Sequence, residues 1–123
     1  MSKIHVWAGT TPDSLEIYSR YFEVDQVQRA LHRPASPFDT DLGTFWYDDD
    51  LIGVCCFEEP RPIGQAVDEL PVLPDILDVV LRKCLELNIG EVNALFYYTD
   101  ATLNVDPLSI YNGLTYLGVF DND

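Results

Sequence analysis

The sequence has few basic residues and no long apolar run, and each shortage excludes a class of function. Seven lysines and arginines stand against 21 acidic residues, which gives a formal net charge of −14 at pH 7. A nucleic acid or an anionic membrane is therefore a poor partner, because proteins bind both through basic side chains. No apolar stretch approaches the roughly 18 residues of a membrane-spanning helix, and the first residues do not follow a signal-peptide pattern. We therefore expect a cytoplasmic protein.

Residues typical of catalysis and metal binding are also scarce. The three cysteines include the adjacent pair Cys55 and Cys56, whose side chains point to opposite faces of a predicted strand, so we expect no disulfide framework and no zinc site. The two histidines, His5 and His32, have no nucleophile at a defined spacing. Phosphate-binding glycine loops, zinc-protease motifs and nucleophile elbows are missing. We predict a protein that is not an enzyme, with no catalytic residue, no metal and no cofactor.

What the sequence does contain is enough apolar and aromatic material for one core. The chain has 123 residues, of which 47% are hydrophobic and 12% aromatic. A disordered acidic tail lacks the apolar surface that offsets chain entropy, so this composition predicts a folded chain. The length suits a single domain over residues 1–123.

The negative charge is unevenly distributed along the chain. Residues 34–60 hold seven acidic residues and no basic one, and residues 84–123 hold six acidic residues and no basic one. These two segments carry 13 of the 14 net negative charges. An acidic surface of this kind attracts and orients a basic protein, although net charge also serves solubility alone. We therefore predict a basic protein partner.

Hydrophobic periodicity predicts an α+β sandwich with a mixed or antiparallel sheet of about five strands, two main helices and one or two short ones. Proline and a preceding threonine or serine predict helix starts at Thr11-Pro12, Ser36-Pro37 and, by the proline alone, Pro74. We expect the first of these helices to end near Glu23 and the last to end at Gly90. Residues 24–35 fit either a short helix or irregular strand. The predicted strands cover residues 3–8, 44–47, 51–57, 92–98 and 114–120, and Asn112-Gly113 marks a turn.

One stretch combines aromatic and acidic residues. Phe45-Trp46-Tyr47 leads directly into Asp48-Asp49-Asp50, an acidic turn that we expect to join two paired strands. Aromatic side chains beside charged ones are typical of binding hot spots, provided that one of the aromatics is exposed. A solvated turn or a site for a hard cation are the alternatives, although the calcium-loop pattern is missing. The predicted partner-binding residues are Asp39, Asp41, Trp46, Asp48, Asp49, Asp50, Glu58 and Glu59.

Several short motifs of the chain stand out together. They are Ile4-His5-Val6-Trp7-Ala8-Gly9, Tyr21-Phe22, Ser36-Pro37-Phe38, Asp41-Leu42-Gly43, Trp46-Tyr47-Asp48-Asp49-Asp50, Asn93-Ala94-Leu95-Phe96-Tyr97-Tyr98 and Tyr116-Leu117-Gly118-Val119-Phe120. With these motifs the chain resembles the immunity protein 22 family of bacterial polymorphic toxin systems.

Trp7, Ser36, Phe38, Tyr47 and Asp50 match the family's motif positions, whereas residues 58–72 and 99–109 match nothing in it. The resemblance implies a protein that binds and blocks a toxin domain. Many such toxins are nucleases with basic surfaces, which an acidic antidote would cover. A small acidic enzyme and a regulatory domain that binds a divalent metal are the alternatives.

Overall fold

The computed structural model describes residues 3–43, 47–99, 105–106 and 109–121. Within these ranges, five strands form one sheet in the order β2-β3-β1-β5-β4, and every pairing is antiparallel. The antiparallel form of the predicted α+β fold is therefore confirmed. The strands are β1 (Lys3–Gly9), β2 (Ile52–Pro62), β3 (Glu91–Tyr98), β4 (Ile110–Tyr111) and β5 (Leu114–Asp121).

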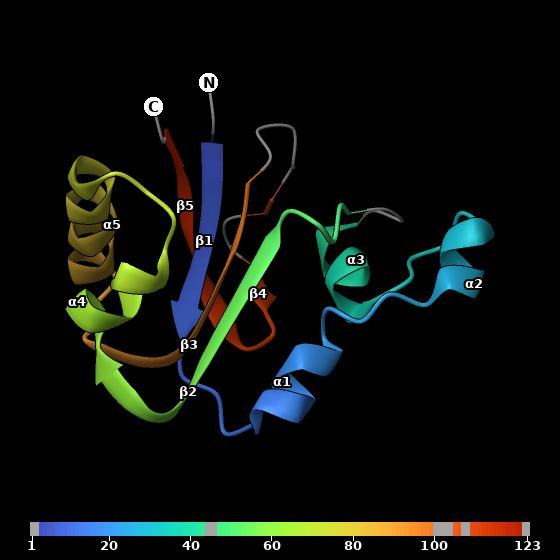
Figure 1. Ribbon diagram of the computed structural model, residues 1–123, viewed down its shortest axis with the longest axis horizontal. Coiled ribbons are helices and arrows are strands. Elements are labelled where there is room, and N and C mark those ends of the chain that lie inside the picture. Colours follow the sequence, from blue (N-terminus) through green and yellow to red (C-terminus); the bar gives the residue numbers. More distant parts are fainter. Residues whose placement is uncertain (1–2, 44–46, 100–104, 107–108, 122–123) are drawn as a thin grey trace.

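Helices lie on both faces of the sheet (Figure 1). The two helices that follow β2 cover one face, and the helices between β1 and β2 lie toward the other. The helices of the described ranges are α1 (Leu15–Arg20), α2 (Gln26–Ala30), α3 (Pro37–Leu42), α4 (Ile63–Ala66), the 3-10 turn η1 (Val67–Glu69) and α5 (Pro74–Glu86).

The two faces of the sheet bury different chemistry. Alternation along β1 sends Ile4, Val6 and Ala8 to one side and Trp7 to the other. The first side is aliphatic and packs against α4 and α5, whereas the second is aromatic and packs against α1, α3 and the chain near Tyr47. The aromatic cluster includes Trp7, Tyr18, Tyr21, Phe22, Phe38, Tyr47, Phe96, Tyr98 and Tyr111.

Several local signals lead to the expected elements. Ser36 caps α3 by accepting a hydrogen bond from the Asp39 N–H at 3.1 Å, and Gly43 ends the helix with a φ of +74°. Asn112 and Gly113, with φ values of +53° and +78°, form the turn between β4 and β5. Such a turn fits the twist of a hairpin, which explains the Asn-Gly pair.

The first helix is shorter than predicted at both ends. Its cap is Ser14 and not Thr11: the Ser14 hydroxyl accepts a hydrogen bond from the Ile17 N–H at 3.4 Å, whereas the Thr11 hydroxyl accepts one from the Asp13 N–H, before the helix begins. The helix ends at Arg20, before the predicted Glu23.

The last helix also ends early, at Glu86 instead of Gly90, since Asn88 takes a left-handed φ of +59°. The ambiguous stretch of residues 24–35 contains the short helix α2, which Asp25 caps.

The predicted hairpin around the acidic turn has its first strand at residues 44–47. Tyr47 belongs to no strand, and residues 44–46 of the predicted partner strand lie outside the described residues. The strand that follows the turn, β2, pairs with β3 and lies at the edge of the sheet. It is apolar on both sides because Val54 and Cys56 pack on the aromatic cluster while Cys55 and Phe57 pack on the aliphatic one.

Phe38 lies at the centre of the aromatic cluster, fully buried against Trp7, Tyr47 and Phe96. Replacing it with alanine should lower the free energy of unfolding by about 3–5 kcal/mol, the usual cost of removing a buried aromatic ring. Leu85→Ala, at an exposed position of α5, is the control and should change it by less than about 0.5 kcal/mol. Urea unfolding followed by tryptophan fluorescence measures both. A loss below about 1 kcal/mol for Phe38→Ala would contradict the assignment of this core.

Candidate partner-binding site

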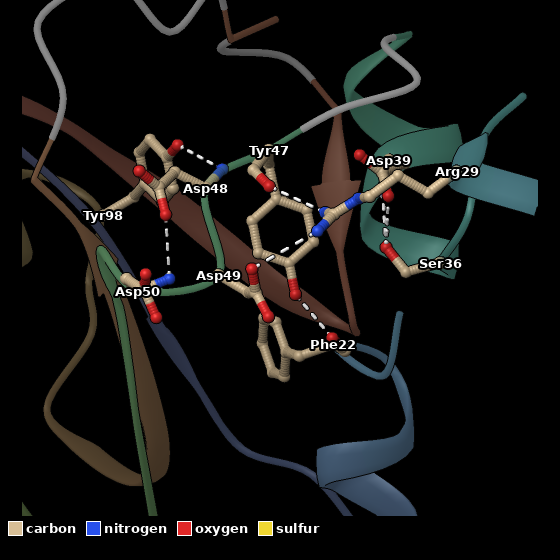
Figure 2. A network of polar contacts seen from close by, with 9 residues as sticks. All are labelled: Phe22, Arg29, Ser36, Asp39, Tyr47, Asp48, Asp49, Asp50 and Tyr98. Atoms are coloured by element: carbon tan, nitrogen blue, oxygen red, sulfur yellow. Dashed lines mark hydrogen bonds and ion pairs between the residues drawn. The ribbon is translucent and has the colours of Figure 1, made fainter. Parts of the chain in front are cut away.

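The three aspartates of residues 48–50 form a turn that the sheet holds in place (Figure 2). The Asp48 carboxylate accepts a hydrogen bond from the Asp50 N–H at 3.0 Å, and the Leu51 N–H donates to the Asp48 carbonyl at 3.0 Å. The Asp48 N–H in turn donates to the hydroxyl of Tyr98 at the end of β3, at 2.7 Å. We call residues 48–50 the acidic turn. Its backbone is fixed by hydrogen bonds at both ends, so its side chains project from a defined position.

Arg29 joins α2 to the acidic turn. Its Nη2 donates to the Tyr47 carbonyl at 2.8 Å, and its Nη1 lies 3.3 Å from the Asp49 carboxylate (Figure 2). The Arg29 side chain is only 5% exposed, whereas that of Asp49 is 50% exposed. The guanidinium also lies over the Tyr47 ring, 5.8 Å from its centre. The positive charge of Arg29 is therefore buried, whereas the Asp49 side chain stays half exposed and Asp50 is exposed.

The outer side of α2 is apolar and exposed. Val27 is 66% exposed and Leu31, one helical turn later, is 54% exposed. Asp25 holds the start of this helix, since its carboxylate accepts hydrogen bonds from the Val27 and Gln28 N–H groups at 3.0 and 3.3 Å. We call Val27 and Leu31 the α2 knob. Exposed apolar side chains next to charged ones are the composition that protein interfaces favour.

Asp39 does not share this surface. It is fully buried, and its Oδ2 accepts a hydrogen bond from the Ser36 hydroxyl at 2.9 Å (Figure 2). A partner cannot reach this carboxylate in the folded protein, so its contact with Ser36 serves the start of α3.

Asp41 is exposed and accepts a hydrogen bond from the Tyr21 hydroxyl at 2.5 Å. Burial of Tyr21, together with this bond to a carboxylate, raises the pKa of the Tyr21 hydroxyl.

The aromatic half of the predicted hot spot is turned inward where the structure describes it. Tyr47 is buried, and its hydroxyl donates to the Phe22 carbonyl. Burial first, and then the negative charges of Asp49 and Asp39, raise the pKa of the Tyr47 hydroxyl. Trp46 lies outside the described residues. The exposed apolar side chains joined to the turn through Arg29 are those of α2, Val27 and Leu31.

Glu58 and Glu59 are exposed on the second half of β2. The acidic turn lies just before the first residue of the same strand. The acidic turn and the pair Glu58 and Glu59 therefore lie at different positions along β2. They do not form one continuous cluster.

Arg29 and the α2 knob were not among the partner-binding residues predicted from the sequence. Residues 24–35 fitted two kinds of structure, so no face could be assigned to these side chains. Asp25 followed by Val27 and Leu31 is the signal that could have found the knob, because an aspartate cap fixes where the helix begins.

No three histidine, cysteine, aspartate or glutamate residues of the described ranges gather in a way that could hold a metal ion. No helix in the same ranges is long and apolar enough to cross a membrane.

Comparison with known proteins places the chain in a class of immunity proteins. Residues 4–123 match the family described as Immunity protein 22, and the chain belongs to that family. The family indicates a role in toxin immunity. No curated protein and no solved structure matches the chain significantly.

The contacts of Arg29 predict the effect of removing its charge. Arg29→Met should lower the free energy of unfolding by about 2–4 kcal/mol, because a buried carbonyl and a half-buried carboxylate lose their donor. Arg33→Met, at an exposed position four residues away, should change it by less than about 0.5 kcal/mol. Urea unfolding at pH 7 measures the pair, and equal effects of the two substitutions would contradict the role given to Arg29.

Proposed function

We propose that this protein neutralises a toxin domain by binding it directly, without catalysis, through the acidic turn and the α2 knob. The observation that carries the proposal is the arrangement around Arg29. One buried guanidinium joins α2 to the acidic turn, so both elements are held in fixed positions, the turn with the exposed side chains of Asp49 and Asp50 and the helix with an exposed apolar pair. A preformed surface of this kind loses little conformational freedom on binding.

The charge of the whole chain supports a basic toxin surface. With a net charge of −14, the protein attracts a basic partner over distances set by the salt concentration. A nuclease is the toxin class that fits best, because nucleases hold phosphates with basic residues. Carboxylates of the acidic turn would then occupy positions that the phosphates of the substrate use.

The raised pKa values of the cysteine thiols support a mechanism without covalent chemistry. Burial raises the pKa of all three thiols, that of Cys84 to about 11. A thiol acts as a nucleophile only as its thiolate, whose population falls as the pKa rises. His5 is buried as well, with its Nδ1 2.7 Å from the Tyr116 hydroxyl. These groups are placed for packing and hydrogen bonding.

Asp50 offers the most direct test, because its carboxylate makes no hydrogen bond or ion pair among the described residues, so the substitution leaves the turn intact. Asp50→Lys should weaken binding to the cognate toxin domain by about ten- to a hundredfold, since a lysine would face basic residues. Binding of the wild type should also weaken more steeply with salt than that of the variant. Isothermal titration calorimetry at two NaCl concentrations measures both effects.

Asp78→Lys is the matched control, because it makes the same charge change on α5, which covers the opposite face of the sheet. It should change the affinity by less than about threefold, as expected for a charge away from the interface. Equal losses for the two variants would show that only net charge matters. An unchanged affinity for Asp50→Lys would show that the acidic turn does not face the toxin.

A further inference from the structure

A concave surface lies where β2 loses its regular pairing with β3. Cys56 is paired with Ala94, and the next paired residue of β2 is Arg61, which faces Val92. Four residues of β2, numbers 57–60, therefore stand opposite the single residue Asn93. Pro60 and Pro62 lack the N–H that a regular ladder uses, which explains why an edge strand carries the irregularity here.

Asn93 uses its side chain to hold the chain before α1 against this bulge. Its Nδ2 donates to the Thr11 carbonyl at 2.8 Å, and its Oδ1 accepts from the Thr11 N–H at 2.8 Å. The segment from Thr11 to Leu15 therefore faces the bulged part of β2 across a cleft of about 510 Å³. A cleft of this volume is within the range of sites that take small groups.

The lining of the cleft combines negative charge with apolar walls. Asp13 and Glu58 supply two carboxylates, while Leu15, which is 57% exposed, and Phe57 supply apolar surface. No lysine or arginine belongs to the lining among the described residues. Burial raises the pKa of the Cys56 thiol, and the negative charge of Asp13 raises it further. The Asp13 carboxylate therefore adds negative potential at Cys56, in the lining of the cleft.

The protein itself shows that this part of β2 accepts a guanidinium. Arg61 lies over the Phe57 ring, with 4.1 Å between its guanidinium carbon and the centre of the ring. It lines the neighbouring depression over residues 56–61 and not the cleft itself.

We propose that the cleft between the start of α1 and the bulge of β2 receives an arginine side chain of the toxin. The proposal rests on the function proposed above and adds a second contact to it. Arginine fits better than lysine because its planar group donates in several directions, toward both Asp13 and Glu58, and stacks on apolar and aromatic surface.

Titration of the isotopically labelled protein with N-acetyl-arginine amide, followed by NMR, tests the proposal without the toxin. Saturable shifts are expected at the amides of Leu15, Cys56 and Asn93, and smaller ones with the lysine analogue. The citrulline analogue, a neutral isostere, should cause none. The double variant Asp13→Asn and Glu58→Gln should bind arginine amide about tenfold more weakly or worse, because two charge-assisted hydrogen bonds lose their charge.

Asp50→Asn is the control, and it should leave these shifts unchanged. Absence of saturable shifts at the cleft, equal shifts with citrulline or lysine, or undiminished binding by the double variant would each overturn the proposal. None of these results bears on the toxin titration with Asp50→Lys. A failure of the cleft is therefore distinguishable from a failure of the proposed function.

Discussion

Arg29 carries a full positive charge, although only 5% of its side chain is exposed. The arrangement of α2 and the acidic turn depends on the groups that compensate this buried charge. Removing a guanidinium from water is costly unless hydrogen bonds and an opposite charge replace the lost hydration. The Tyr47 carbonyl and the Asp49 carboxylate supply both. Because these partners lie 18 and 20 residues further along the chain, their compensation of Arg29 fixes α2 against the acidic turn.

The aromatic layer under this surface explains how such short helices persist. Helices α1, α2 and α3 have six, five and six residues, and helices of that length are unstable by themselves in water. Large rings from α1 and α3 pack against Trp7 and Phe96 of the sheet, and each helix has a polar cap. Packing and caps together thus hold α1 and α3, whereas α2, which has no residue in the aromatic cluster, is held by the Asp25 cap and the contacts of Arg29. The opposite, aliphatic layer relies on the longer helix α5.

The features that could be predicted from the sequence are those determined by neighbouring residues. Ser36 with Pro37 begins α3, Pro74 begins α5, and Asn112 with Gly113 turns the last hairpin, all as local chemistry requires. The features that could not be predicted depend on distant partners.

The backbone of Thr11 is bound by the side chain of Asn93, 82 residues away, and α1 begins only after Ser14. Burial of Asp39 and exposure of Asp50 likewise depend on the packing of the aromatic layer, although both are aspartates of one acidic segment. The composition therefore indicated that residues 34–60 are acidic. Which of their carboxylates are buried and which are exposed is determined by the fold.

Hydrogen–deuterium exchange of the protein, alone and with its cognate toxin domain, tests the central claim most directly. Amide exchange reports local opening and is slowed where a partner covers the backbone or stabilises it. The account predicts slower exchange in the complex over residues 25–31 and 47–52, and unchanged exchange over α5. Protection confined to α5, with none over the acidic turn or α2, would contradict it.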